Sequence, residues 1–76
     1  MFDRIVSDPA ILSGKPIVKG TRLSVEFLLE LVASGGTIPQ IVAQYPQLTA
    51  GDVEQALRFA ANALKNEVVV TARLAG

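Results

Sequence analysis

The segment TIPQIVAQYPQLT, residues 37–49, decides the fold of this 76-residue chain. Thr37 followed three residues later by Gln40 is a capping box, the pattern that starts a helix. Pro39 falls early enough in that helix to be tolerated, whereas Pro46 ends it because proline clashes with continued helical geometry. Between these ends, apolar side chains recur at helical spacing, at Ile38, Ile41, Val42 and Tyr45. The segment therefore predicts a short helix followed by a turn.

A longer helix is predicted directly after that turn. Thr49 is a good N-cap residue, and Asp52 follows it three positions on. The buried stripe of this helix is expected to consist of Val53, Leu57, Ala60 and Leu64, with Phe59 toward its margin. Leu48 is placed to fill the corner between the two helices. A short helix, a turn and a longer helix, preceded by a packing helix, is the order of a helix-turn-helix unit.

The packing helix is predicted to begin after Ser24, an N-cap residue with Glu26 in the following turn, and to end at Gly35. Its first apolar face consists of Val25, Leu28, Leu29 and Val32. Phe27 and Leu31 form a second apolar stripe beside that face. A surface helix this apolar normally has two neighbours. We therefore expect a dimer or partner interface with Phe27, Leu31 and Phe59 as its apolar anchors, in which the N-terminal ribbon and this helix build the dimer.

Residues 1–23 are predicted to form a short β-ribbon at the N-terminus. The runs Arg4–Val6 and Pro16–Val18 are β-prone, and Gly20 is typical of a tight turn after which residues 21–23 return antiparallel to the second run. We therefore expect one mainly α domain over residues 1–66 and a tail over 67–76. In that tail, Val68–Thr71 is either a strand that pairs with another chain or a loosely held end.

The composition points to a protein that works in an assembly. Half of the residues are apolar, and the mean hydropathy is +0.41 for a mass of only 8.0 kDa. A domain this small buries too little of its surface to be more than marginally stable alone. The sequence has no Cys and no His, which excludes disulfides, thiol nucleophiles and imidazole bases. We expect a homodimer in the cytoplasm, with no membrane segment, no cofactor, no metal and no enzymatic activity.

The charge distribution disfavours tight DNA binding by a single copy. The formal net charge is zero, with seven basic and seven acidic residues. Residues 23–57 contain four acidic residues, Glu26, Glu30, Asp52 and Glu54, and no basic one. A self-sufficient nucleic-acid binder normally carries a clear positive excess. Glu26 and Glu30 are spaced as one exposed helix edge rather than as a metal site.

A more specific signal is the stretch GKPIVKGTR, residues 14–22. It resembles the G-x-P-x-[IV]-x-G-T-R signature of the small prokaryotic domain-of-unknown-function family 433, and residues 29–35 and 45–49 are similar to that family as well. The resemblance covers roughly residues 4–64. It implies a homeodomain-like trihelical core of VapB antitoxin type that dimerises, neutralises a PIN-like ribonuclease toxin and binds its own promoter. It implies no catalytic residues. The chain departs from the family at residues 68–71, where a charged extension is usual.

Arg22 is the first candidate for a binding residue. Its planar donor fork suits a DNA phosphate or a carboxylate of the toxin. It could equally hold the ribbon together by pairing with Asp8 or by capturing carbonyl groups at a helix end. Lys15 and Lys19 lie on the same ribbon and could follow a phosphate backbone, although solvated lysines are the more common outcome.

In a helix-turn-helix protein, side chains facing outward at the start of the longer helix read base edges. Those candidates are Gln47, Thr49, Gln55 and Arg58. Asp52 and Glu54 stand among them and are expected to repel phosphate.

Two hypotheses follow. In the first, the protein is a dimeric antitoxin that binds a PIN-like nuclease and, weakly by itself, promoter DNA. In the second, it is a homodimeric protein-interaction module with no DNA role. The charge distribution favours the second hypothesis, and the family resemblance favours the first.

Overall fold

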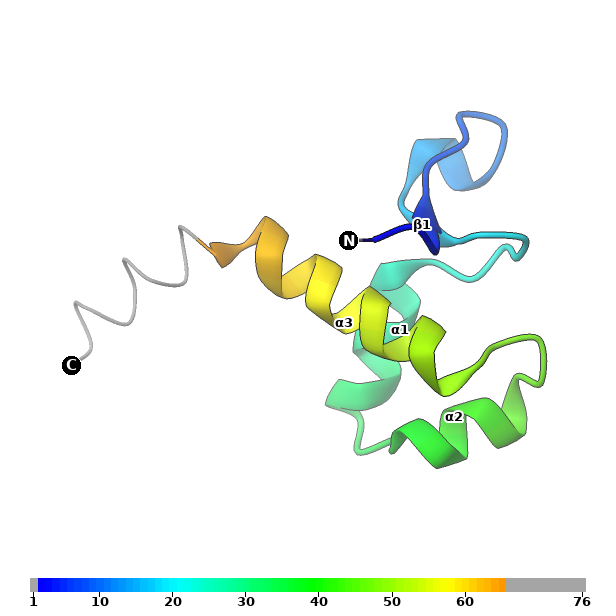
Figure 1. Ribbon diagram of the computed structural model, residues 1–76, viewed down its shortest axis with the longest axis vertical. Coiled ribbons are helices and arrows are strands. Elements are labelled where there is room, and N and C mark those ends of the chain that lie inside the picture. Colours follow the sequence, from blue (N-terminus) through cyan, green and yellow to red (C-terminus); the bar gives the residue numbers. More distant parts are fainter. Residues whose placement is uncertain (1, 66–76) are drawn as a thin grey trace, which may run out of the picture.

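Three helices and a two-stranded sheet make up residues 2–65, the part of the chain that the computed structural model describes. Strands β1 (Ile5–Val6) and β2 (Ile17–Val18) are connected through a short 3-10 turn, η1 (Leu12–Gly14). Helices α1 (Val25–Ala33), α2 (Ile38–Gln44) and α3 (Ala50–Ala63) follow (Figure 1). The mainly helical class with a three-helix core and a short N-terminal ribbon is confirmed. The predicted tail, residues 67–76, lies outside the described residues.

Each helix begins at the residue that the sequence predicts. The Ser24 hydroxyl oxygen accepts a hydrogen bond from the backbone N–H of Phe27 at 2.9 Å. The other two helices begin with complete capping boxes, formed by Thr37 with Gln40 and by Thr49 with Asp52. Helix α2 ends at Gln44, with Tyr45 as its C-cap residue directly before Pro46. Local sequence chemistry therefore fixes where the helices start and stop.

The core forms where α3 packs against both α1 and α2. Leu28 of α1 and Val53 and Ala56 of α3 are completely buried, as is Val18 of β2. Leu48 is 2% exposed and fills the corner between α2 and α3, as predicted. The small Ala56 side chain lets the two longer helices approach closely.

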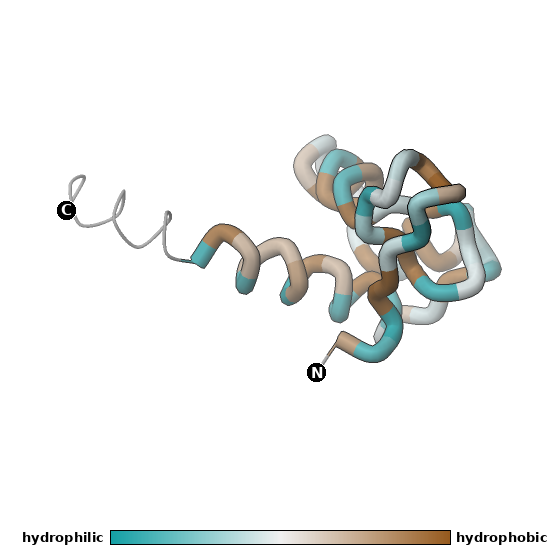
Figure 2. Tube along the Cα trace, turned by 90° about the horizontal axis from the view of Figure 1, so that it is seen from above, coloured by the Kyte–Doolittle hydropathy of each residue, from teal (hydrophilic) through white to brown (hydrophobic). Residues whose placement is uncertain are grey.

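The predicted stripe of α3 is wrong at its last member, Leu64. This side chain is 50% exposed. The C-terminal end of α3 extends beyond the rest of the domain (Figure 2), so the last member of the stripe is only partly covered. Within residues 2–65, no helix is long and apolar enough to cross a membrane.

The strand that pairs with β2 is not the predicted one. The sequence predicts that residues 21–23 pair with residues 16–18. β2 pairs antiparallel with β1, with Ile5 opposite Val18 and Val6 opposite Ile17. The returning segment, residues 21–23, does not form a strand, but it does run back along β2: the Val18 N–H donates to the Leu23 carbonyl at 3.0 Å, and an isolated antiparallel bridge joins Ile17 and Ser24. Gly20 has a φ of +80° in the turn between them, which agrees with the predicted tight turn.

Candidate functional site

An ion pair between Arg4 and Asp52 ties the N-terminal segment to the start of α3. The Arg4 Nε donates to Asp52 Oδ1 at 2.8 Å, and the Asp52 side chain is only 3% exposed. The other carboxylate oxygen accepts the backbone N–H of Thr49 at 3.0 Å. Arg4 also donates from Nη2 to the carbonyl oxygen of Lys19 at 3.3 Å. One guanidinium thus connects α3 with the turn after β2.

The Asp52 carboxylate is stabilised in its ionised form. Burial raises the pKa of the carboxyl, but the hydrogen bonds from Arg4 and Thr49 outweigh burial and hold this pKa below its ordinary value of 3.8. The same contact raises the pKa of the Arg4 guanidinium. The expectation that Asp52 faces outward and repels phosphate is therefore wrong, because its charge is buried and paired.

Residues 2–4 act as a strap over α3, and Gln55 is the residue they hold. The backbone N–H of Arg4 donates to Gln55 Oε1 at 3.0 Å, and Gln55 Nε2 donates to Asp3 Oδ1 at 3.0 Å. The hydrogen bond from Gln55 lowers the pKa of the Asp3 carboxyl. Phe2 packs edge-on against Phe59, with the ring centroids 5.5 Å apart. Two predicted base readers, Gln55 and the cap residue Thr49, thus use their side chains in hydrogen bonds to other residues of the domain.

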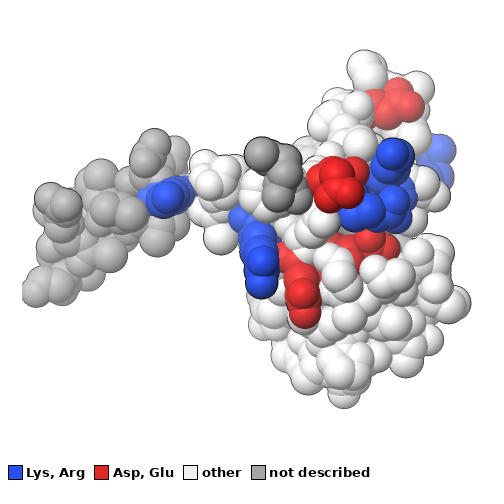
Figure 3. All heavy atoms as spheres, viewed as in Figure 1, with Lys and Arg blue, Asp and Glu red and all other residues white. Residues whose placement is uncertain are grey.

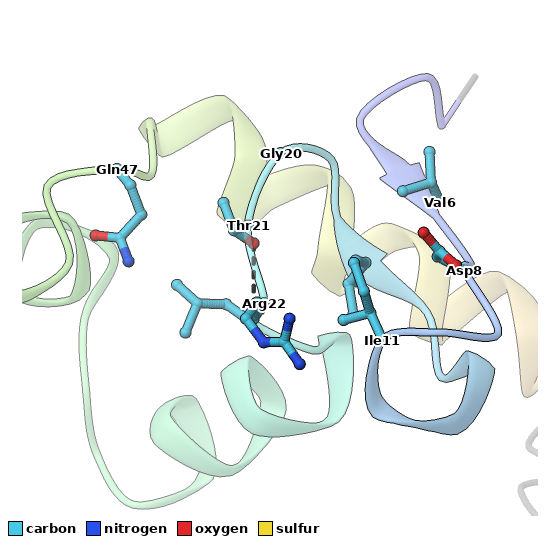
Figure 4. A pocket seen from close by; sticks show the side chains of 9 residues that line it. Val6, Asp8, Ile11, Gly20, Thr21, Arg22 and Gln47 are labelled. Atoms are coloured by element: carbon cyan, nitrogen blue, oxygen red, sulfur yellow. Dashed lines mark hydrogen bonds between the residues drawn. The ribbon is translucent and has the colours of Figure 1, made fainter.

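Arg22 lies in a groove between the N-terminal segment and the turn that leads into α3. This first groove has a volume of about 610 Å³ and is lined by residues that include Val6, Asp8, Ile11, Arg22, Leu23 and Gln47. Arg22 and Asp8 are both exposed, and within residues 2–65 they do not form an ion pair with each other or with another residue. The expected structural pairing of Arg22 with Asp8 is therefore absent from the described chain. Figure 4 shows the guanidinium pointing toward Ile11, with Asp8 beyond it.

The remaining predicted cations are dispersed. Lys15 Nζ contacts Glu26 Oε1 at 2.8 Å, and this exposed pair raises the pKa of Lys15 and lowers the pKa of Glu26. Lys19 and Arg58 are exposed, on the turn after β2 and on α3 respectively. Of the seven candidate DNA contacts, the structure brings only Arg22 and Gln47 to one groove.

A second groove, of about 260 Å³, lies between the start of α1 and the second half of α3. Its lining is almost wholly apolar and includes Leu29, Phe59 and Leu64, with Lys15 and Glu26 beside them. Leu29 is 36% exposed. Of the predicted partner residues, Phe59 lies in this groove, whereas Phe27 packs edge-on against Tyr45 with centroids 5.6 Å apart. Phe27 and Leu31 are half-buried and pack against the core.

Comparison with known proteins gives the family of the chain. The family described as "Protein of unknown function (DUF433)" matches residues 5–60. The chain belongs to the DUF433 family. A solved structure of a DUF433 member protein from Anabaena variabilis has the same fold, with a TM-score of 0.75 and 24% sequence identity over 97% of this chain and 70% of that one.

The chain is also similar to the uncharacterised protein y4eO of Sinorhizobium fredii. The two are 36% identical over 62 residues. That alignment covers 80% of this chain but only 28% of the relative. The DUF433 chain thus spans less than a third of the length of this curated relative.

The structure gives a physical reason for much of the GKPIVKGTR stretch that indicated the DUF433 family. Gly14 and Gly20 have φ values of +84° and +80°, in the region that favours glycine. Ile17 and Val18 form β2 and are buried in the core. Thr21 holds the turn, because its hydroxyl donates to the Val18 carbonyl at 2.8 Å. Arg22 and Lys19 are exposed and make no side-chain hydrogen bond or ion pair within residues 2–65, so no internal contact accounts for these two cations.

A large part of the DUF433 surface carries no charge. Residues 31–51 contain no Lys, Arg, Asp or Glu, and they include α2 and the turns on both sides of it. Figure 3 shows no charged side chain at the bottom of the view, where α2 lies in Figure 1, while the charges gather around the ribbon and α3. In the described residues, no group of three or more potential metal ligands occurs.

Proposed function

We propose that this DUF433 protein is the antitoxin-type component of a toxin–antitoxin pair, which binds and neutralises a PIN-like ribonuclease as a homodimer in the cytoplasm. The observation that carries this proposal is the second groove, an open apolar surface on the outside of a helix-turn-helix core. The role is one of binding. No catalytic step is assigned to this chain.

The second groove has the character of a protein-binding surface. Aromatic residues are enriched in protein–protein interfaces, and the buried centre of such an interface is its most apolar part. Here Phe59 lies in the groove between the partly exposed Leu29 and Leu64. The Lys15–Glu26 pair at its edge adds polar groups at the rim. We propose that an apolar helix of the ribonuclease lies in this groove.

DNA binding belongs to the proposal as a property of the dimer. Lys19 and Arg58 are exposed cations that lie outside both grooves and are the residues proposed to contact phosphate in the dimer. A zero net charge gives weak phosphate attraction for a single copy. Promoter DNA is therefore expected to bind better to the complex with the nuclease, which brings further contacts.

A second candidate function is a homodimeric interaction module without a DNA role, and a specific observation favours it. In helix-turn-helix proteins the first helix of the motif crosses the DNA backbone, but α2 and its flanking turns carry no cation. Gln55 and Thr49, two of the predicted base readers, are also engaged inside the domain.

Co-expression with the genes that flank its own gene, followed by affinity purification, tests the antitoxin proposal. A PIN-like nuclease is expected to co-purify, and its cleavage of RNA is expected to stop in the complex. Leu29→Lys places a charge in the second groove and should release the nuclease. Ala33→Lys is the matched control, because Ala33 is exposed on the same helix outside that groove. Co-purification that is equally strong for both variants would rule out this docking surface.

A mobility-shift assay with the upstream promoter DNA separates the two candidate functions. The antitoxin proposal predicts retardation by the complex at low salt, with an affinity that falls as salt rises. If neither the protein nor its complex retards the DNA at low salt, the interaction module without a DNA role remains.

A further inference from the structure

We infer that the first groove is the contact surface between two copies of this chain, arranged so that Arg22 of each copy pairs with the partner's Asp8. The inference rests on the homodimer in the proposed function and adds the face that forms it. It also explains why two opposite charges stand unpaired in one groove.

Both charged groups are available for such a contact. Asp8 Oδ1 accepts the backbone N–H of Ala10 at 2.9 Å, and no other hydrogen bond to this carboxylate occurs within residues 2–65. Arg22 makes no side-chain hydrogen bond within the same range. Since both residues line the first groove without forming an ion pair, the groove presents a cation and an anion that remain separate inside one copy.

Apolar side chains surround the two charges. Val6, Ile11 and Leu23 line the first groove, and Val6 is 36% exposed. The neighbouring Leu12 is 42% exposed. A second copy that packs on these side chains would bury apolar area. It would also shield the ion pairs from water and salt, so that their attraction would be stronger and would fix how the two copies are aligned.

The charge pattern selects a second copy as the occupant. In a two-fold symmetric contact, residue i of one copy meets residue j of the other, and residue j meets residue i. A groove that carries both Arg22 and Asp8 is therefore complementary to itself. One contact of this kind satisfies four charges and forms two Arg–carboxylate pairs, whose geometry the planar guanidinium favours.

The second groove does not offer this complementarity. Its charged residues, Lys15 and Glu26, already pair with each other inside one copy. That groove consequently stays open for a different protein, whereas the first groove is assigned to dimerisation.

Charge exchange in the full-length chain tests the inference by analytical ultracentrifugation. Arg22→Asp and Asp8→Arg each place like charges opposite one another twice per dimer, and each is expected to weaken self-association by about tenfold or more. The first variant carries two anions in the groove and the second carries two cations. Mixed in equal amounts, they are expected to form a 1:1 heterodimer, and the double exchange in one chain is expected to restore the homodimer. Lys19→Asp is the matched control, because Lys19 is exposed on the same turn but does not line the groove.

Several outcomes would overturn the inference. A wild-type chain that stays a single molecule at all concentrations would do so, as would a dimer that Arg22→Asp does not weaken, or single variants that do not associate when mixed. If Asp8→Arg does not fold, Asp8→Asn serves in its place, since the amide oxygen can still accept the Ala10 N–H. Added to Arg22→Asp it removes the repulsion, and no recovery of the dimer would then count against the inference. Nuclease binding through the second groove is measured separately, so a failure of this dimer contact is distinct from a failure of the proposed function.

Discussion

Asp52, buried at the start of α3, accepts a hydrogen bond at 2.8 Å from the guanidinium of Arg4, which lies 48 positions earlier in the chain. The same carboxylate completes the capping box with Thr49. One side chain therefore both starts the longest helix and anchors the N-terminal strap on it. This coupling makes the ribbon and the helical core depend on each other.

Arg4→Met tests the energetic weight of this pair. The substitution keeps a long apolar side chain but removes the guanidinium, which leaves the buried Asp52 carboxylate without its cation. We expect the melting temperature to fall by about 5–10 °C at pH 7, measured by circular dichroism. Arg58→Met is the control, since Arg58 is exposed on α3 and has no ion pair within residues 2–65. An equal loss in both variants would contradict a special role for Arg4.

The pH dependence of stability follows from the lowered pKa of Asp52. Because the folded-state pKa lies below the ordinary value of 3.8, its stabilising contribution is complete above that value and is lost as the pH falls through the folded-state pKa. Asp3 and Glu26 have lowered pKa values too and act in the same direction. Thermal melts of the wild type should therefore show decreasing stability as the pH is lowered from about 5 to 3.

The Asp52 contribution can be separated by comparison with Arg4→Met. This variant lacks the guanidinium that contributes to the low pKa of Asp52, so it should lose less stability on acidification. The difference in melting temperature between the two proteins is expected to narrow between pH 7 and pH 3. A difference that stays constant would show that the ion pair is not the source of the acid sensitivity.

Thr49 was a candidate DNA contact, and its hydrogen bonds allow a structural role to be tested directly. Its hydroxyl oxygen accepts the Asp52 N–H at 3.1 Å. Thr49→Ala removes this cap and should lower the free energy of unfolding by about 0.5–2 kcal/mol, whereas Thr49→Ser keeps the hydroxyl and should restore most of it. Urea unfolding measures both. Should Thr49→Ala weaken DNA binding without any loss of stability, the residue would act at the DNA instead.

The sequence predicts the local parts of this fold well, for a physical reason. A cap such as Ser24 or Thr37 acts on a backbone group three residues away, and Pro46 acts on its neighbours, so the relevant chemistry lies within one short window. Leu48 could be placed in the corner because the two predicted helices leave a single apolar residue between them to fill it. These are all short-range relationships.

The candidate site was harder to predict because its contacts are long-range. Nothing near Arg4 in the sequence indicates that it contacts Asp52. From helical periodicity alone, Gln55 faces outward as a base reader would, and only the structure shows that residues 2–4 cover it. Leu64 continues the apolar period of α3, but periodicity does not show where the neighbouring helix ends. The sequence assigns the stabilising arginine contact of the ribbon to Arg22, but in the structure Arg4 makes it, because Arg4 lies next to the buried Asp52 carboxylate.

Replacing Gly36 or Gly51 with alanine is expected to change the free energy of unfolding in opposite directions. A Cβ at Gly36 would lie 2.9 Å from the carbonyl oxygen of Leu31, the same oxygen that accepts the Gly36 N–H. Because backbone cannot move aside without losing this hydrogen bond, Gly36→Ala should lower the free energy of unfolding by about 1–3 kcal/mol. Gly51 is exposed in the first turn of α3, and a Cβ there would meet only the Thr49 hydroxyl oxygen at 3.7 Å. Gly51→Ala should therefore raise the free energy of unfolding by up to about 1 kcal/mol, because alanine loses less backbone entropy in a helix. Parallel urea titrations check both, and a destabilised Gly51→Ala would contradict the entropy argument for the first turn of α3.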